Sequence, residues 1–281
     1  MRWLRNINPF LIIGVLSLGG LGYFGFQIFN WYLDNLNTNE ILNEVRYSVL
    51  EPQVASTPIK GVIKNSEDSF ESIPRHKPSP NNLSIDFDEL KKRNSDIVAW
   101  LKFDAVNIDM PIVQTTDNEF YLNHNLDKRR SSTGWVFADV RSNLSHLGFN
   151  TVLYGHNLAN GQMFGSLKEL LKDDKLAVPE FRQLHLITEK QSMLFEIVSV
   201  FRTNEKDFKY VKQIFLDDSE RQAYLGYIHD MNEVAFLNGS SISLHDKFLT
   251  LSTCSGPSGT EKRLVTVAKL ASVAKLASLE F

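Results

Sequence analysis

The chain has 281 residues, of which 43% are hydrophobic and 22% are charged, and its net charge is −3 at pH 7. This balanced, slightly acidic composition lacks the basic surface that nucleic-acid binding requires, so nucleic acid is not an expected partner. The single cysteine excludes a disulfide within the chain. The spacing of the histidines and the cysteine does not match a zinc site, so we expect no metal and no cofactor.

The N-terminal region contains an apolar run from residue 10 to residue 29. At about 1.5 Å per residue, a helix of this length spans about 30 Å, the thickness of the hydrocarbon core of a membrane. The aromatic residues Trp31 and Tyr32 follow the run, where a cleavable signal would have small residues. The sequence therefore predicts an uncleaved transmembrane anchor over 10–31 and an interaction with membrane lipid.

The charges on either side of this anchor predict its orientation. Arg2 and Arg5 precede it, and acidic residues follow it. By the positive-inside rule, residues 1–9 are cytoplasmic and the rest of the chain is extracellular. The next segment, 32–82, is expected to hold a short juxtamembrane helix between Asp34 and Ser48, followed by a linker rich in Pro, Ser, Asn and Lys.

A folded domain is expected over 83–272, and its size suits one hydrophobic core. Ser84 or Asp86 can cap a first helix that runs to about Asn94. Alternating and apolar runs then predict strands at 97–103, 105–113, 134–138, 150–154, 185–188, 192–202, 247–253 and 263–270. Helices are predicted at 163–172 and, longer, at 219–236. The domain is therefore mainly β.

Cys254 is the residue whose side chain most clearly indicates a catalytic role. It ends the apolar run 248–253, and a loop of Ser, Gly and Pro follows it. Arg263 begins the next predicted strand. A thiol at a strand end can attack an acyl group while a fixed guanidinium stabilises the oxyanion. The alternative is that the cysteine is a small buried hydrophobic residue.

His156 is the histidine whose setting resembles that of the cysteine, because it follows the predicted strand 150–154 directly after a glycine. An imidazole can donate and accept a proton near neutral pH, so it can act as general acid and base. The remaining histidines lie in polar or mixed stretches, which favours solvated or locally hydrogen-bonded roles: His76, His124, His146, His185, His229 and His245.

Three segments together resemble the sortases of Gram-positive bacteria, most closely their class B branch: Leu-Tyr-Gly-His (153–156), Thr-Leu-Ser-Thr-Cys (250–254) and Lys-Arg-Leu-Val-Thr-Val-Ala-Lys-Leu (262–270). Residues 111–114, 117–124 and 134–137 extend the resemblance, which covers roughly 84–270. It implies a closed β-barrel of about eight strands with an N-terminal helix and a long helix before the cysteine strand.

The resemblance also implies a reaction. Cys254 would attack the carbonyl of a threonine in the C-terminal sorting signal of a surface protein. His156 would protonate the departing amine, and Arg263 would hold the oxyanion. The resulting acyl-enzyme would pass to an amine, either of a cell-wall peptidoglycan precursor or of a pilin lysine. Lys262 matches a basic position of the family and is expected to be structural.

Four further residues match positions that line the signal-binding groove of class B enzymes: Asn118, Leu122, Tyr154 and Ser252. For Leu122 and Tyr154 a purely structural role in the core is an equal alternative. Some class B enzymes have an acidic residue two positions after the cysteine, but Gly256 occupies that position here. A Cys-His-Arg arrangement is therefore preferred over a triad with an aspartate.

Two functions of other classes stay open. The chain could be a membrane-tethered cysteine hydrolase, in which water resolves the acyl-enzyme, or an inactive surface adaptor that binds peptides. The sorting motif, the acceptor amine and the choice between wall anchoring and pilus assembly are not specified by the sequence.

The C-terminal end contains a tandem repeat, because residues 267–272 and 273–278 have the same six letters, Val-Ala-Lys-Leu-Ala-Ser. Two copies are too few for a solenoid, which needs at least about three repeats to bury a core. The first copy is expected to complete the last strand, and residues 273–281 are expected to be a frayed extension or a cloning scar.

Overall fold

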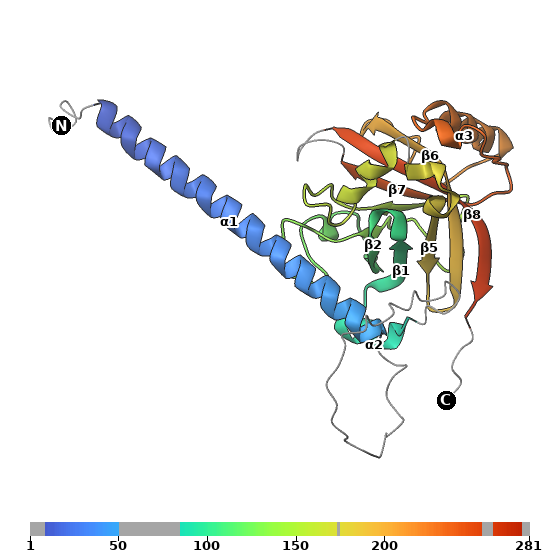
Figure 1. Cartoon of the computed structure of the whole chain (residues 1–281), viewed down its shortest axis with the longest axis horizontal. Coiled ribbons are helices and arrows are strands. Elements are labelled where there is room, and N and C mark those ends of the chain that lie inside the picture. The colour runs from blue at the N-terminus through green and yellow to red at the C-terminus, as the bar shows by residue number, and fades with distance from the viewer. Residues whose placement is uncertain (1–8, 51–84, 173–174, 255–260, 277–281) are drawn as a thin grey trace, which may run out of the picture.

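The computed structural model describes residues 9–50, 85–172, 175–254 and 261–276. Eight strands form a closed barrel in the order β1-β2-β3-β4-β7-β8-β6-β5, which confirms the predicted architecture (Figure 1). The strands are β1 Ile97–Phe103, β2 Ile108–Val113, β3 Phe137–Ala138, β4 Asn150–Tyr154, β5 Gln183–Ile187, β6 Gln191–Asn204, β7 Phe248–Cys254 and β8 Lys262–Lys275. Only the β2–β3 and β4–β7 pairs are parallel; the other pairs are antiparallel.

The helices lie outside the barrel. The α-helices are α1 Pro9–Leu50, α2 Phe87–Arg93 and α3 Asp218–Asp230, and the short 3₁₀ turns are η2 Asp104–Val106, η3 Phe120–Leu122, η4 Gly165–Leu171, η5 Lys175–Ala177, η6 Pro179–Arg182 and η7 Ala235–Leu237. Helix α2 begins as predicted, because the Asp86 carboxylate caps it by accepting from the backbone N–H of Glu89 at 2.9 Å.

Two clusters of buried side chains hold these layers together. The larger one fills the barrel interior and includes Trp100, Trp135 and Phe195, each at most 2% exposed. The smaller one lies between α3 and the outer faces of β6, β7 and β8, where Tyr224 and Ile228 of the helix pack on the strands. This cluster therefore attaches α3 to the barrel.

Two predicted helices are shorter or tighter than expected. Helix α3 ends at Asp230 rather than at 236, because the Asn232 side chain accepts from Val200 N at 3.1 Å and Glu233 N donates to Val200 O at 2.9 Å. These bonds draw the chain back to β6. The predicted helix at 163–172 is the 3₁₀ segment η4, where Gly165 lies against the backbone of Leu158.

Three predicted strand boundaries also change. The strand predicted at 105–113 starts at Ile108, because a left-handed residue, Asn107 with φ 55°, ends the turn η2 before it. The strand predicted at 134–138 is reduced to Phe137–Ala138. Strand β8 continues to Lys275, beyond the first copy of the repeat, because the long strand β6 offers Gln191–Met193 as partners for this end.

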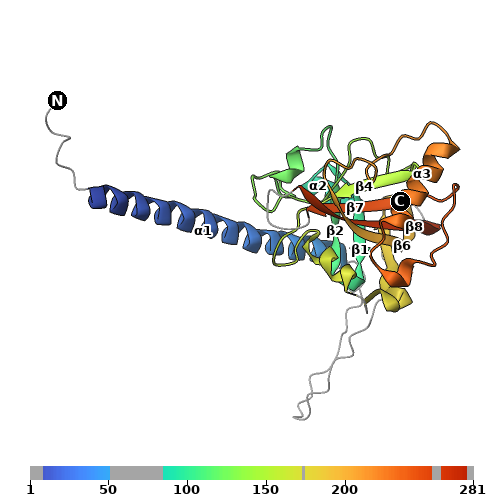
Figure 2. The ribbon, with the colours of Figure 1, turned by 90° about the horizontal axis from the view of Figure 1, so that it is seen from above.

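Helix α1 combines the predicted anchor and the predicted juxtamembrane helix into one continuous element of 42 residues. No proline interrupts it after Pro9, and it ends just before Glu51-Pro52, where a proline disfavours helix in the preceding residue. Most of the predicted linker lies outside the described residues. Figures 1 and 2 show the first half of α1 projecting away from the barrel and the second half lying against it.

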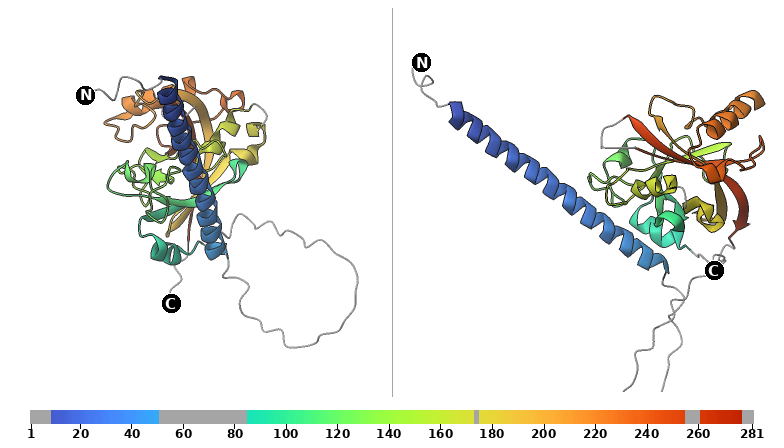
Figure 3. Two further views of the ribbon diagram at one scale, coloured as in Figure 1. Left: turned by 90° about the vertical axis from the view of Figure 1, so that its left-hand side faces the viewer. Right: turned by 45° about the horizontal axis from the view of Figure 1, so that its top comes forward.

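The two halves of α1 have different surroundings. Large apolar side chains of the first half are exposed, such as Leu21 at 70%. In the second half an apolar stripe is buried against α2 and β2, made of Ile41, Leu42, Val45 and Val49. The right view of Figure 3 also shows the first half of α1 projecting away from the barrel. The described part of the chain holds one helix long and apolar enough to cross a membrane.

Candidate active site

The register of three strands brings the predicted catalytic residues to one end of the barrel. In the parallel pair β4–β7, Tyr154 is opposite Ser252, and Gly155 N donates to Ser252 O at 3.2 Å. Two residues beyond these partners, Cys254 is the last residue of β7 and His156 follows the end of β4, so their backbones lie at the same edge of the barrel. In the antiparallel pair β7–β8, Arg263 is the partner of Cys254.

His156 is held from two directions. Its Nε2 donates to the backbone carbonyl of Leu122 at 2.6 Å; a carbonyl only accepts, so this bond places a proton on Nε2 and leaves Nδ1 for proton exchange. Gly134 lies beneath the ring with φ +56°, and a Cβ there would come within 2.8 Å of the His156 Cδ2. Gly155 is also required, because a Cβ would meet the Phe164 ring at 2.8 Å.

Arg263 is oriented by an acidic residue that the sequence analysis did not identify. Its Nη2 donates to the carboxylate of Glu205, and its Nη1 donates to Lys262 O at 3.0 Å. The Arg263 side chain is 20% exposed and the Glu205 side chain 42%. Glu205 follows β6, and it reaches Arg263 because β6 pairs with β8. No local motif marks Glu205, since this pairing joins segments far apart in sequence.

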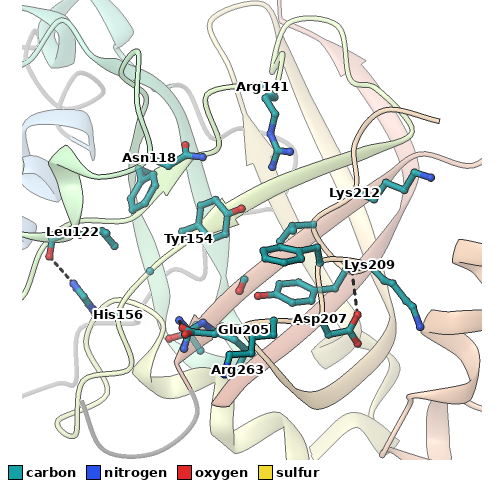
Figure 4. Close-up of a pocket in the computed structure, with 18 residues that line it drawn as sticks. Asn118, Leu122, Arg141, Tyr154, His156, Glu205, Asp207, Lys209, Lys212 and Arg263 are labelled. Atoms are coloured by element: carbon teal, nitrogen blue, oxygen red, sulfur yellow. Dashed lines mark hydrogen bonds and ion pairs between the residues drawn. The ribbon is translucent and has the colours of Figure 1, made fainter. Parts of the chain in front are cut away.

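A cavity of about 960 Å³ opens beside these residues. In the view of Figure 4, His156 and Arg263 both lie in the lower part of the lining and Arg141 lies at the top. All four residues predicted to contact the substrate line it: Asn118, Leu122, Tyr154 and Ser252. The Leu122 residue is 43% exposed, so it is not a core residue. Asn118 uses its Oδ1 to accept from Val140 N at 2.8 Å.

Two lining residues of the cavity, Arg141 and Tyr154, contact a buried carboxylate, Asp139, which directly follows β3. It accepts from Arg141 Nη2 at 2.7 Å and from the Tyr154 hydroxyl at 2.9 Å. Burial raises the pKa of Asp139, but the hydrogen bonds and charge of Arg141 outweigh burial and hold the pKa at about 2. Burial and the adjacent carboxylate raise the pKa of Tyr154, so its hydroxyl stays protonated. Arg141 and Tyr154 are thus both held by the same carboxylate.

The segment between β6 and α3 forms the opposite wall, which the sequence analysis also missed. The cavity-lining residues here include Asp207, Phe208, Lys209 and Tyr210. Phe208 is 73% exposed beside the cavity. The segment lacks periodicity, so neither a strand nor a helix was predicted for it. Among the described residues, no group of three or more His, Cys, Asp or Glu side chains could hold a metal ion.

Comparisons with known proteins agree with this architecture. The family model described as a sortase domain matches residues 101–271. The chain is 30% identical to sortase B of Listeria monocytogenes over 260 residues, which cover 91% of this chain and 95% of that protein. It is 32% identical to sortase B of Staphylococcus aureus over 193 residues, covering 66% and 75% of the two chains.

Solved structures are similar as well. A Staphylococcus aureus sortase B–substrate complex has a TM-score of 0.61 at 29% identity, covering 68% of this chain and 85% of the other. A Bacillus anthracis sortase B structure has a TM-score of 0.66 at 27% identity, covering 85% and 99%. The barrel, the matched domain and these relatives together assign the chain to the sortase family of cysteine transpeptidases, in its class B branch, whose members act in cell-wall protein anchoring.

Proposed function

We propose that this chain is a membrane-anchored transpeptidase that cleaves a C-terminal sorting signal after threonine through Cys254. The observation that carries the proposal is the strand register, which brings the backbone positions of Cys254 and Arg263 opposite each other, beside the end of β4 that leads to His156. His156 and Arg263 line one cavity, and the backbone of Cys254 lies beside that of Arg263. The individual roles of these three residues follow from the chemistry of their side chains.

In the first half of the reaction, which starts with Cys254 as a thiolate and His156 protonated, the sulfur forms a bond to the threonine carbonyl carbon. The carbonyl electrons move to oxygen, and the Arg263 guanidinium stabilises the oxyanion that results. When this intermediate collapses, the peptide bond breaks, and His156 gives a proton to the departing amine. A thioester between Cys254 and the threonine remains.

In the second half, an incoming amine attacks the thioester. His156 accepts a proton from this amine, the new amide bond forms, and the sulfur leaves as the thiolate. The cavity opens beside His156 and Arg263, which supports this step, because an acceptor has to reach the thioester from solvent. The acceptor is an amine of a peptidoglycan precursor or a pilin lysine.

The four residues predicted to contact the substrate, which line the cavity, are proposed to contact the sorting signal. Leu122 supplies an exposed apolar surface next to His156, and Tyr154 lines the cavity while its hydroxyl donates to Asp139. Ser252 lies two positions before the nucleophile on the same strand. Asn118 contributes from the segment that precedes η3.

Anchoring is proposed to occur through the first half of α1. Its large apolar side chains are exposed, an arrangement that is costly in water and favourable in lipid. With Arg2 and Arg5 on the cytoplasmic side, the barrel is extracellular and lies close to the membrane. The domain would then meet surface proteins as they leave the membrane.

The test uses the full chain in detergent micelles and peptides with Thr-Gly, Thr-Asn and Thr-Ala at the cleavage position. Mass analysis of the products, with and without an added amine, is the measurement. Cleavage after threonine with a product joined to the amine is expected. Products of hydrolysis alone would favour the cysteine hydrolase, and a peptide that binds without forming an adduct on Cys254 would favour the adaptor.

A further inference from the structure

The part of α1 around residues 34–39 contacts both loops that hold His156. One loop, 121–134, supplies the carbonyl that accepts from the imidazole and the glycine beneath the ring. The other, 156–164, starts at His156 itself and closes on it, because Phe164 N donates to His156 O at 3.0 Å. Residues 34–39 of α1 hydrogen-bond to each of them.

The contact with the first loop is made by Asp34 and Thr38. The Thr38 hydroxyl lies 2.8 Å from the Thr133 hydroxyl, and both residues are fully buried. The Asp34 carboxylate accepts from Ser132 N at 2.8 Å and from the Ser132 hydroxyl at 2.7 Å. Thr133 directly precedes Gly134, so these bonds fix the part of the loop on which the His156 ring lies.

The contact with the second loop is made by Asn35 and Asn39. Asn160 Nδ2 donates to Asn35 Oδ1 at 2.6 Å, and Gln162 Nε2 donates to Asn39 Oδ1 at 2.7 Å and to Asn35 O at 3.1 Å. Asn35 is only 6% exposed. Hydrogen bonds of this kind are directional, unlike the apolar stripe that attaches α1 further along.

We propose that Thr38 and Asn35 are positioning residues for His156, so that the anchor helix forms part of the support of the active site. The inference rests on the proposed role of His156 as general acid and base. A small displacement of a proton-transfer group lowers the rate strongly, because the reacting atoms have to stay within hydrogen-bonding reach. These bonds are made to Ser132, Thr133, Asn160 and Gln162, and none is made directly to the four proposed substrate-contact residues, so the effect is expected in kcat rather than in KM.

The experiment compares Thr38→Val, which keeps the shape but loses the hydroxyl, with Thr38→Ser, which keeps the hydroxyl. Both are made in the full chain in detergent micelles, and kcat and KM are measured by peptide transfer to an added amine. Thr38→Val is expected to lower kcat about 3- to 10-fold, the range of one net hydrogen bond, with KM unchanged. Thr38→Ser is expected to restore kcat. Asn35→Ala, which acts through the other loop, is expected to lower kcat in the same way.

The matched control is Arg46→Gln on the same helix. Arg46 Nε donates to Asp109 O at 2.8 Å, on β2, so the variant weakens docking without touching either loop. Thermal unfolding is measured for all variants. An unchanged kcat in Thr38→Val and Asn35→Ala would overturn the inference, and so would an equal loss of kcat in Arg46→Gln at the same melting temperature. A fully active His156→Gln would instead overturn the proposed function.

Discussion

The two sides of the site are built in different ways. Cys254 and Arg263 are placed by a ladder, in which seven consecutive residues of β7 each face one residue of β8. His156 leaves the barrel after β4 and depends on a carbonyl, a glycine and a helix that all come from other segments. The strand side is therefore specified by local pattern and register, whereas the loop side is specified by tertiary contacts.

This difference has an energetic consequence. Shifting the register of β8 would break many backbone bonds together, so the strand side resists small changes elsewhere in the protein. The loop side has few bonds, and each of them can be lost singly. We therefore expect distant substitutions to affect proton transfer more readily than the attack of the thiol.

The largest expected effect is that of Cys254→Ala on the strand side. Cleavage of sorting peptides should fall to background, because no other cysteine exists in the chain to form the thioester. The residue ends a strand, so the loss of sulfur should leave the fold unchanged. Peptide cleavage and circular dichroism of the full chain in detergent measure the two effects. Cleavage above background by the variant would show that Cys254 is not the nucleophile.

On the loop side, His156→Gln should lower the rate about 100- to 10,000-fold, the usual contribution of a general acid and base. If thiolate and imidazolium must be present together, the wild-type rate should follow a bell-shaped pH profile whose limbs belong to the coupled pair. The measurement is kcat/KM across the pH range. A constant rate from about pH 6 to 9 would argue against His156 in this role.

Arg263→Lys should cost about 100- to 1000-fold in the rate of acylation, as the loss of an oxyanion donor does. A lysine keeps the charge but cannot replace the planar guanidinium that also binds Glu205. Single-turnover acylation by the variant is the measurement.

The control is the neighbouring residue, Lys262→Ala. Side chains alternate along a strand, and Lys262 is exposed, so its loss should have little effect on acylation. Losses of similar size at the two positions would mean that the register of β8 does not determine which cation acts.

The strand side was also the part that could be predicted from the sequence. The apolar runs of β4 and β7 are local, so these strands could be predicted from pattern, whereas the closed barrel and the roles of Cys254, His156 and Arg263 were implied by the resemblance to sortases. Glu205 and the contact of Thr38 with Thr133 could not be predicted, because each joins segments far apart in the chain. The continuity of α1 was missed for a related reason: its second half is stabilised by docking on the barrel, and the two parts differ in composition.

The smallest expected effect is a change in the free energy of unfolding with pH. It concerns Asp139, which accepts a hydrogen bond from the Tyr154 hydroxyl. The Asp139 pKa is about 2, below its ordinary value of 3.8. A depressed pKa means that the carboxylate stabilises the folded state above the unfolded pKa and that this stabilisation is lost as pH falls through about 2. Nearly two pKa units correspond to about 2 kcal/mol. The free energy of unfolding of the wild type, measured by denaturant at pH 5 and near pH 2, should fall by about this amount relative to Asp139→Asn, which does not titrate. The free energies of unfolding of the wild type and of Asp139→Asn could instead differ by the same amount at both pH values. That result would show that the bonds of Arg141 and Tyr154 do not depend on the charge of Asp139.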